Sequence, residues 1–204
     1  MPRRATQILH NGRKVLEDLD LLKVLQSEIK HELSSPPLQD NRRGSLGDFS
    51  VDWDSSDSQD VVLRRKCETG EQVVVSALSR PSCFAEGSTS PWEFLMKVFV
   101  KKPGLNSVLQ FDCGIYEIGP SRSVFDIHNA YYLQSTTCPG PSAYGGPYFS
   151  DLDPHLRIAL KEYLVAKGIS ESLTNFLFLH LRKKEQGQYG NWLQKLESFV
   201  AKEE

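Results

Sequence analysis

The sequence predicts an α+β fold in which a twisted antiparallel sheet of seven strands carries its helices on one face. Three observations predict it. Apolar residues recur with a helical period over residues 15–34 and 153–201, and with a period of two across residues 49–150. The segments with period two follow one another through short connections, which only antiparallel neighbours allow. One face of these segments is apolar and the other largely polar, so we expect helices on the apolar face alone.

The first segment is predicted to be a helix over residues 15–34. Its apolar side chains form one stripe, made by Leu19, Leu22, Leu25, Ile29 and Leu33. Prolines at 36 and 37 end this helix, because proline cannot continue the helical hydrogen-bond ladder. Residues 1–14 contain bases and no acid, as in a basic tail or the remnant of a presequence. Residues 35–48 are predicted to be a flexible linker.

The middle of the chain is predicted to be the sheet, over residues 49–150. Residues 61–67 and 72–78 flank the turn sequence at 68–71 and indicate a hairpin. Further alternating segments lie near 49–54, 94–100, 109–115 and 125–133. Two stretches rich in Pro, Gly and Ser, near 79–91 and 134–147, are predicted to be mobile loops.

Two or three helices are predicted over residues 153–201. Asp153 before Pro154 is typical of a helix start, and Gly168 is typical of the position just past a helix end. Ser170 is predicted to cap the next helix, which Gly187 and Gly190 can bend or interrupt. We expect the first and last helices to pair as an antiparallel coiled coil, using the stripe of the first and a stripe formed by Trp192, Leu196, Phe199 and Val200.

Composition excludes several classes of protein. The 204 residues include 26 acids and 24 bases, so a net charge of −2 gives no overall attraction to nucleic acid or anionic membrane. No apolar run is long enough to span a bilayer. The cysteines lack metal or redox spacing, and we expect free thiols in a reducing compartment, with an oxidised framework as the alternative; they are Cys67, Cys83, Cys113 and Cys138. The whole chain is predicted to be a single domain.

No catalytic motif occurs in the sequence, so we assign no catalytic residue, cofactor, metal or small-molecule substrate. The histidines form neither of the spacings that bind zinc on one helix. His128 follows Asp126 by two residues on one predicted strand, an arrangement that suits a general base. We favour a surface histidine there. A hydrolase is the least favoured hypothesis and requires a solvent-accessible pocket that holds both residues.

One stretch of the chain concentrates acids without an intervening base: Asp48, Asp52, Asp54, Asp57 and Asp60. Asp52 and Asp54 are expected to share one strand face, because side chains alternate along a strand. These acids are candidates for binding a basic partner segment or a divalent cation. The alternative, which we weigh more heavily, is a solvated edge strand whose charges deter aggregation.

Two short runs of bases are the candidates for nucleic-acid binding: Arg64, Arg65 and Lys66, and Arg182, Lys183 and Lys184. An RNA-binding groove also needs aromatic side chains among its bases. Tyr131 and Tyr132 lie on a different predicted strand, so structural ion pairs are the favoured interpretation.

Three blocks of the sequence resemble the mitochondrial glycoprotein family in its plant form. They are VDWDSSDSQDVVLRRKCETG at 51–70, FDIHNAYYL at 125–133, and the long block at 152–200 that begins LDPHLRIALKEYLVAKG. The resemblance implies a seven-stranded antiparallel sheet with one N-terminal and two C-terminal helices, assembled as a homotrimer.

The same resemblance implies a function. It is that of a non-enzymatic scaffold or chaperone-like adaptor of the mitochondrial matrix, which binds other proteins and supports mitochondrial translation and respiratory-complex assembly. The alternative is an RNA-binding or RNA-processing accessory protein. The short basic start of the chain leaves the cytoplasm or nucleus as the alternative location if it carries no presequence.

Overall fold

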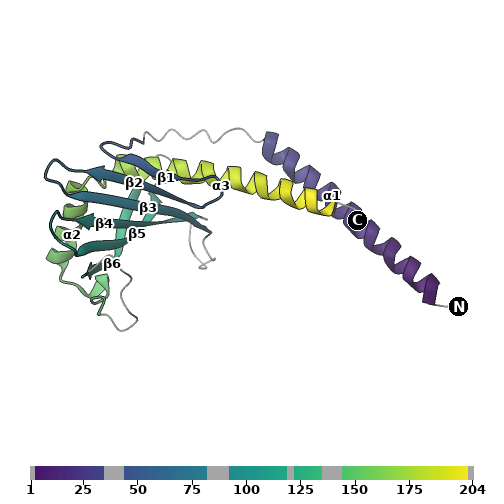
Figure 1. Ribbon diagram of the computed structural model, residues 1–204, viewed down its shortest axis with the longest axis horizontal. Coiled ribbons are helices and arrows are strands. Elements are labelled where there is room, and N and C mark those ends of the chain that lie inside the picture. The colour runs from purple at the N-terminus through teal and green to yellow at the C-terminus, as the bar shows by residue number, and fades with distance from the viewer. Residues whose placement is uncertain (1–2, 35–43, 82–91, 119–121, 135–143, 202–204) are drawn as a thin grey trace. The chain divides into compact units, whose positions relative to one another are not determined.

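The computed structural model describes residues 3–34, 44–81, 92–118, 122–134 and 144–201 (Figure 1). The elements follow in the order α1 (Arg3–Ser34), β1 (Ser50–Asp54), β2 (Asp60–Lys66), β3 (Gln72–Pro81), β4 (Trp92–Lys101), β5 (Val108–Ile118), β6 (Arg122–Leu133), the short 3₁₀ helix η1 (Phe149–Asp151), α2 (Pro154–Ala166) and α3 (Glu171–Val200). They belong to two compact units. Residues 40–185 form the sheet unit, and residues 1–39 with 186–204 form the helical unit.

The sheet has six strands in the described residues, not the seven that we predicted. Their spatial order is the order of the chain, β1-β2-β3-β4-β5-β6, and every neighbouring pair is antiparallel. No seventh strand occurs among the described residues, and residues 144–148, between β6 and η1, have no regular structure. The antiparallel meander itself is confirmed.

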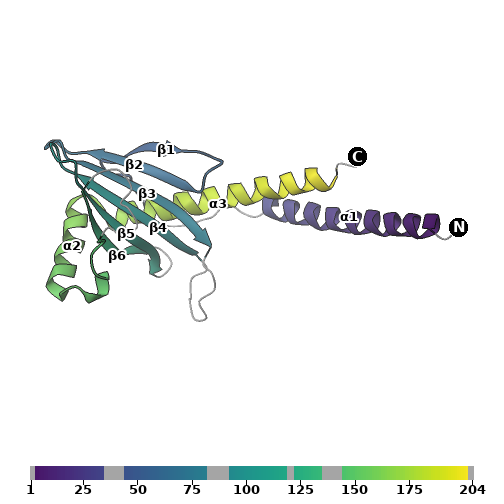
Figure 2. The same cartoon turned by 60° about the horizontal axis from the view of Figure 1, so that its bottom comes forward.

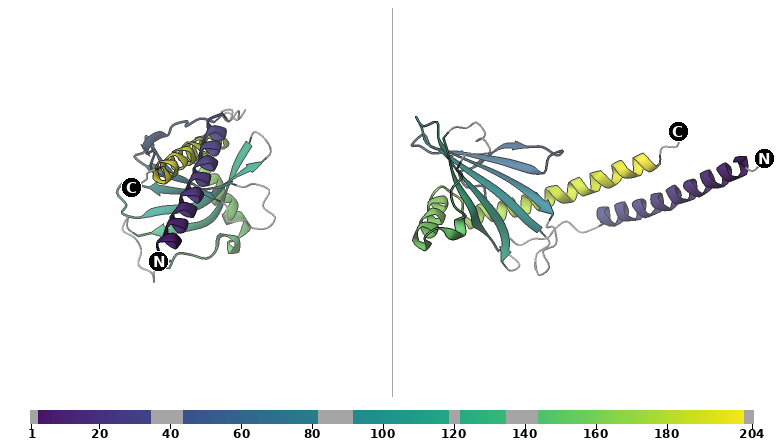
Figure 3. Two further views of the ribbon diagram at one scale, coloured as in Figure 1. Left: turned by 90° about the vertical axis from the view of Figure 1, so that its right-hand side faces the viewer. Right: turned by 90° about the horizontal axis from the view of Figure 1, so that it is seen from below.

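The apolar face of the sheet packs against α2 and the first half of α3. Phe94 of β4 and Phe178 of α3 are both buried, and their ring centroids lie 4.7 Å apart in an edge-on contact. Leu164 of α2 and Leu177 of α3 are fully buried in the same cluster. Figures 2 and 3 show the first half of α3 running along this one face. Burial of each such side chain contributes about 1.5–3 kcal/mol, so this layer is the core of the unit.

The other face of the sheet is less polar than predicted. Val74 and Leu78 of β3 point away from the core because they alternate with buried residues of the same strand. The strand register sets Val74 opposite Phe99 and Leu78 opposite Leu95. All of these side chains are half-buried. This face therefore carries apolar cross-strand pairs that no described helix of the sheet unit covers (Figure 2).

Residues 44–48 are anchored, although the whole of 35–48 was predicted to be a flexible linker; residues 35–43 lie outside the described part of the chain. The Ser45 amide donates a hydrogen bond to the Ser172 carbonyl at 3.1 Å. Gly44 lies directly against the backbone of Phe176, where any side chain would collide with it. Glycine is therefore needed where this segment meets α3.

The predicted ends of the C-terminal helices are confirmed. The Asp153 carboxylate accepts hydrogen bonds from the backbone amides of His155 and Leu156, which caps α2. Gly168 follows α2 with φ +95°, a conformation that glycine adopts without strain. Ser170 accepts from the Leu173 amide at 3.3 Å at the start of α3. Helix α3 continues through both Gly187 and Gly190 without a break.

The predicted loop near 79–91 begins later than expected. Strand β3 continues to Pro81 and β4 starts at Trp92. Ser79 is a buried strand residue, so only 82–91 of this prediction fall outside the described residues. Of the second predicted loop, near 134–147, residues 135–143 lie outside the described part.

In the helical unit, α1 begins at Arg3, so residues 3–14 are helical and the predicted helix start at residue 15 is wrong. Most of these residues favour a helix, and propagating an existing helix is easier than starting one. Hydrogen bonds join Gln26 to Glu197 at 3.0 Å and Tyr189 to Glu28 at 3.1 Å. The residue numbers of these pairs increase along α1 while they decrease along α3, so the two helices run antiparallel.

The predicted seam between these helices is only partly buried. Leu25 of α1 is buried, whereas Leu19 and Leu33 of the same stripe are exposed. On α3 the buried residue is Leu193, while Trp192 and Phe199 are exposed. Leu196 and Val200 of the predicted α3 stripe are half-buried, as are Leu22 and Ile29 of α1, so among the described residues the predicted seam is formed in part, with Leu193 buried where Trp192 was predicted.

Candidate functional site

A β-bulge separates Asp52 from Asp54, which we predicted to share a face. Val51 lies opposite Leu63 and Trp53 opposite Val62, so Asp52 is the extra residue of β1. Asp54 pairs with Val61 on the core side, and its carboxylate contacts α3. The Asp52 carboxylate instead accepts a hydrogen bond from Arg64. Arg64 follows the buried Leu63 in β2, so its side chain lies on the outer face of the sheet. The two acids therefore belong to opposite faces.

Asp54 is the centre of a cluster of side chains between β1 and α3. Its Oδ2 lies 2.8 Å from Nε2 of His180, and its Oδ1 accepts from Lys184. The Lys184 side chain is only 9% exposed and also donates to the Asp60 carbonyl at 2.7 Å. Partial burial raises the pKa of Asp54, but the hydrogen bonds from Lys184 and His180 outweigh it and leave the pKa below its ordinary value.

Two further acids of the run pair with bases of the first basic run. Arg64 donates to Asp52 at 2.7 Å, and Arg65 lies 3.0 Å from Asp48. The hydrogen bond to Arg64 lowers the pKa of Asp52. These acids and bases thus pair with one another, as the ion-pair interpretation of the basic runs predicted. Among the described residues, the members of these runs that enter no ion pair are Asp57, Asp60, Lys66, Arg182 and Lys183.

Asp126 and His128 line one pocket, of about 670 Å³, between β6, η1 and α2. Other members of its lining are Tyr148, Phe149, Arg157, Ile158 and Lys161. The pocket required by the hydrolase hypothesis exists, but the two residues have different partners. Asp126 accepts from Lys161 at 2.9 Å, while His128 Nε2 lies 2.6 Å from the Tyr116 hydroxyl. The contacts of the described residues therefore include no hydrogen bond by which Asp126 orients His128 as a base.

Gly114 of β5 makes room for the pair of Tyr116 and His128. A Cβ at this position would lie 2.9 Å from Cε1 of His128 and closer still to the Tyr116 ring. His128 itself occupies a bulge in β6, because Asn129 pairs with Asp112 while Ile127 pairs with Cys113. Bulges redirect side chains, and this one places the imidazole beside Tyr116.

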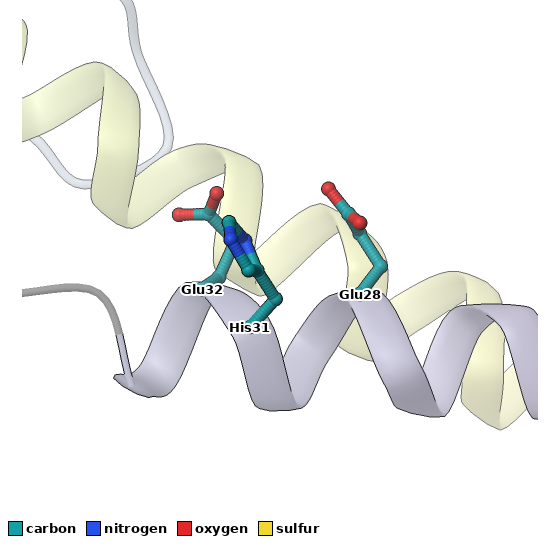
Figure 4. Close-up of side chains that lie close together, drawn as sticks. All are labelled: Glu28, His31 and Glu32. Carbon is teal, nitrogen blue, oxygen red and sulfur yellow. The ribbon is translucent and has the colours of Figure 1, made fainter.

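Three side chains of α1 form a group with the composition of a metal site: Glu28, His31 and Glu32 (Figure 4). One potential ligand atom from each lies within 4.8 Å of the others. The spacing of three and four residues places them on one side of the helix, which is the signal that our search for histidine pairs missed. Carboxylates and imidazole bind divalent transition metals, but Glu28 also accepts a hydrogen bond from Tyr189.

Cys67 and Cys113 are free thiols; Cys83 and Cys138 lie outside the described residues. Cys113 is buried in the core, and this burial raises the pKa of its thiol to about 12. Cys113 is therefore a packing residue and not a nucleophile.

Comparison with known proteins agrees with this architecture of a meander followed by helices. The family model described as mitochondrial glycoprotein matches residues 85–200, more than half of the chain. The chain belongs to the mitochondrial glycoprotein family. The resemblance found in the sequence is thereby confirmed.

Two relatives belong to this comparison. A mitochondrial protein of Arabidopsis thaliana, itself uncharacterized, is 28% identical over 204 residues, which cover 92% of this chain and 76% of that protein. The mitochondrial acidic protein mam33 of Schizosaccharomyces pombe is 32% identical over 111 residues, covering 50% of this chain and 39% of that protein.

Two solved structures share the mitochondrial glycoprotein fold of this chain. The Trypanosoma brucei p22 protein superposes with a TM-score of 0.68 at 20% identity, covering 91% of this chain and 100% of that one. A Leishmania major protein described as a homologue of human p32 protein gives a TM-score of 0.68 at 19% identity, with 91% and 99% covered. At this level of identity the likeness shows the fold alone. None of the described helices combines the length and apolar character that crossing a membrane requires.

Proposed function

We propose that this member of the mitochondrial glycoprotein family is a non-enzymatic binding protein, a scaffold or chaperone-like adaptor that works as a homotrimer in the mitochondrial matrix. Its proposed clients are proteins of mitochondrial translation and respiratory-complex assembly. Family membership and the mitochondrial relatives support the location and the class of function.

The observation that carries the proposal is the apolar outer face of the sheet. The cross-strand pairs Val74–Phe99 and Leu78–Leu95 are half-buried, and within the sheet unit the described helices lie on the opposite face. The two apolar pairs lie on either side of the Ser76–Lys97 pair, and their side chains make this face suited to association with another protein surface. The charged residues that we had singled out support such a role less well, since most of them are paired with one another.

The test of association is the mass of the protein in solution. Light scattering of the wild-type chain over a range of concentrations is expected to give a trimer. Val74→Glu places a charge on the outer face and should shift the protein toward monomer, while Thr69→Glu in the exposed β2–β3 turn should not. A wild-type chain that is monomeric at every concentration contradicts the trimer.

Client binding is tested by affinity capture from purified mitochondria. The wild-type chain should retain proteins of translation and of respiratory complexes, and Val74→Glu should retain fewer. Asp57→Asn tests the acidic run without breaking an ion pair of the described residues. Equal capture by all variants would mean that neither the outer face nor the acidic run binds clients.

A further inference from the structure

We infer that the pocket between β6, η1 and α2 binds a peptide segment of a partner protein in which an apolar side chain adjoins a carboxylate. The inference rests on the proposed binding function and names the partner chemistry of one site. The pocket holds about 670 Å³, enough for a large side chain and its neighbours.

The walls of the pocket supply the apolar part of the recognition. Phe149 of η1 and Ile127 of β6 line its interior. At its mouth, Tyr148 is 75% exposed and Ile158 is 57% exposed. Large apolar side chains exposed around a concavity are a mark of binding sites. Because these two side chains extend the apolar surface beyond the mouth, a peptide fits the site better than a small free acid.

The charges of the lining select an acidic partner. The lining contains two bases, Arg157 and Lys161, both from α2. Its acid is Asp126, which lies near His128, so bases outnumber acids in the lining. The Nε atom of Arg157 is buried and has no hydrogen-bond partner among the described residues. A guanidinium presents a planar fork of donors that matches a carboxylate. A partner carboxylate in the pocket would pair with the guanidinium of Arg157, which is part of the lining.

Lys161 is also open to a second acid. Its ion pair with Asp126 has side-chain exposures of 48% and 62%, so water screens it. An incoming carboxylate can therefore share Lys161 without breaking a buried interaction. A basic segment would instead face Arg157 and Lys161 as like charges, which disfavours it in this pocket.

Fluorescence anisotropy of the purified full chain tests the site. The probe is a short fluorescein-labelled peptide with a phenylalanine followed by two glutamates. Two control peptides replace the glutamates by glutamines or the phenylalanine by alanine. We expect the acidic aromatic peptide to bind at least about tenfold more tightly than either control, as for loss of a charge-assisted contact or an apolar anchor.

Variants of the chain locate the binding. Arg157→Gln should weaken the acidic peptide about tenfold and leave the glutamine peptide unchanged. Lys102→Gln, an exposed base in the β4–β5 turn, is the matched control and should bind like wild type. Ile158→Ala should weaken both phenylalanine peptides. Thermal unfolding monitored by circular dichroism establishes that each variant is folded.

Several results would overturn the inference. They are equal affinity for the acidic and glutamine peptides, wild-type affinity in Arg157→Gln, or absence of binding by the folded wild-type chain. A change of molecular mass in Arg157→Gln would assign the pocket to a second copy of this chain instead. If clients are still captured from mitochondria while the peptide fails to bind, the pocket is wrong and the proposed function stands.

Discussion

Lys184 of α3 donates a hydrogen bond to the backbone carbonyl of Asp60, 2.7 Å away, while the same ammonium group pairs with Asp54. This nearly buried cation therefore joins the end of β1 and the start of β2, on either side of the β1–β2 turn, to the helix on the core face. The interaction is structural, although Lys184 first drew attention as a candidate for binding RNA.

Removal of this cation is predicted to destabilise the sheet unit. Lys184→Met should lower the free energy of unfolding by about 1–3 kcal/mol, because the Asp60 carbonyl and the Asp54 carboxylate lose a donor. Urea unfolding followed by circular dichroism measures the effect. Lys183→Met, at the exposed neighbouring position, is the matched control and should change stability by less than about 0.5 kcal/mol. Equal effects of the two variants would contradict the role of Lys184.

Acidification is predicted to weaken the same cluster. Partial burial raises the pKa of Asp54, but hydrogen bonds from Lys184 and His180 lower it further than burial raises it. A carboxyl group with a lowered pKa in the folded state contributes stability above its unfolded pKa, and this contribution is lost as the pH falls through the folded pKa. The free energy of unfolding should therefore decrease below about pH 4.

Urea unfolding at a series of pH values from about 7 to about 3 tests this dependence. Asp54→Asn removes the titrating group and should show a shallower acid loss than wild type. Asp57→Asn, exposed in the β1–β2 turn, should retain the wild-type slope. A wild-type slope in Asp54→Asn would show that other carboxyl groups dominate acid unfolding.

The two described cysteines are predicted to differ in reactivity. Burial raises the pKa of the Cys113 thiol to about 12, whereas Cys67 is half-buried near a turn. Near neutral pH, iodoacetamide should alkylate Cys67 while Cys113 reacts at least about a hundredfold more slowly, because the thiolate is the nucleophile. Peptide mass spectrometry measures both rates. Cys113 should become reactive in urea; fast native alkylation of Cys113 would show that its site opens.

A side chain at position 114 is predicted to displace the Tyr116–His128 pair. Gly114→Ala should cost about 1–3 kcal/mol, because its Cβ overlaps the tyrosine ring. Urea unfolding measures the loss. Tyr116→Ala in the same chain should recover part of it, as the overlapping ring is removed. Additive effects of the two substitutions would contradict this contact.

Sequence patterns predicted the parts of the fold that depend on neighbouring residues. The period of two placed all six observed strands, and Asp153 and Gly168 marked the ends of α2, because alternation and capping act within a few residues. The predicted number of strands, seven, was wrong, because the described sheet has six. The early start of α1 was missed because a run of bases near the N-terminus is compatible with both a tail and a helix.

The candidate sites depend on contacts between distant residues, which is why they were less predictable. The bulge at Asp52 reverses the face of every later residue in β1, and no feature of VDWD marks it. Asp54 meets His180 and Lys184 only through tertiary packing. The pocket likewise joins β6 to α2. Asp126 and His128 were noted together because they lie on one strand, but their neighbours Arg157 and Ile158 carry no sequence motif.

The position of α3 at the end of the fold has a consequence for biosynthesis. A ribosome completes all six strands before it makes the residues that cover the apolar face of the sheet. Ile169 and Leu177 are among these late residues. Adjacent strands can pair as they emerge, but the nascent sheet exposes an apolar, aggregation-prone face until the last quarter of the polypeptide is synthesised. Translation that stalls or ends before residue 169 should therefore yield an aggregating product that depends on chaperones.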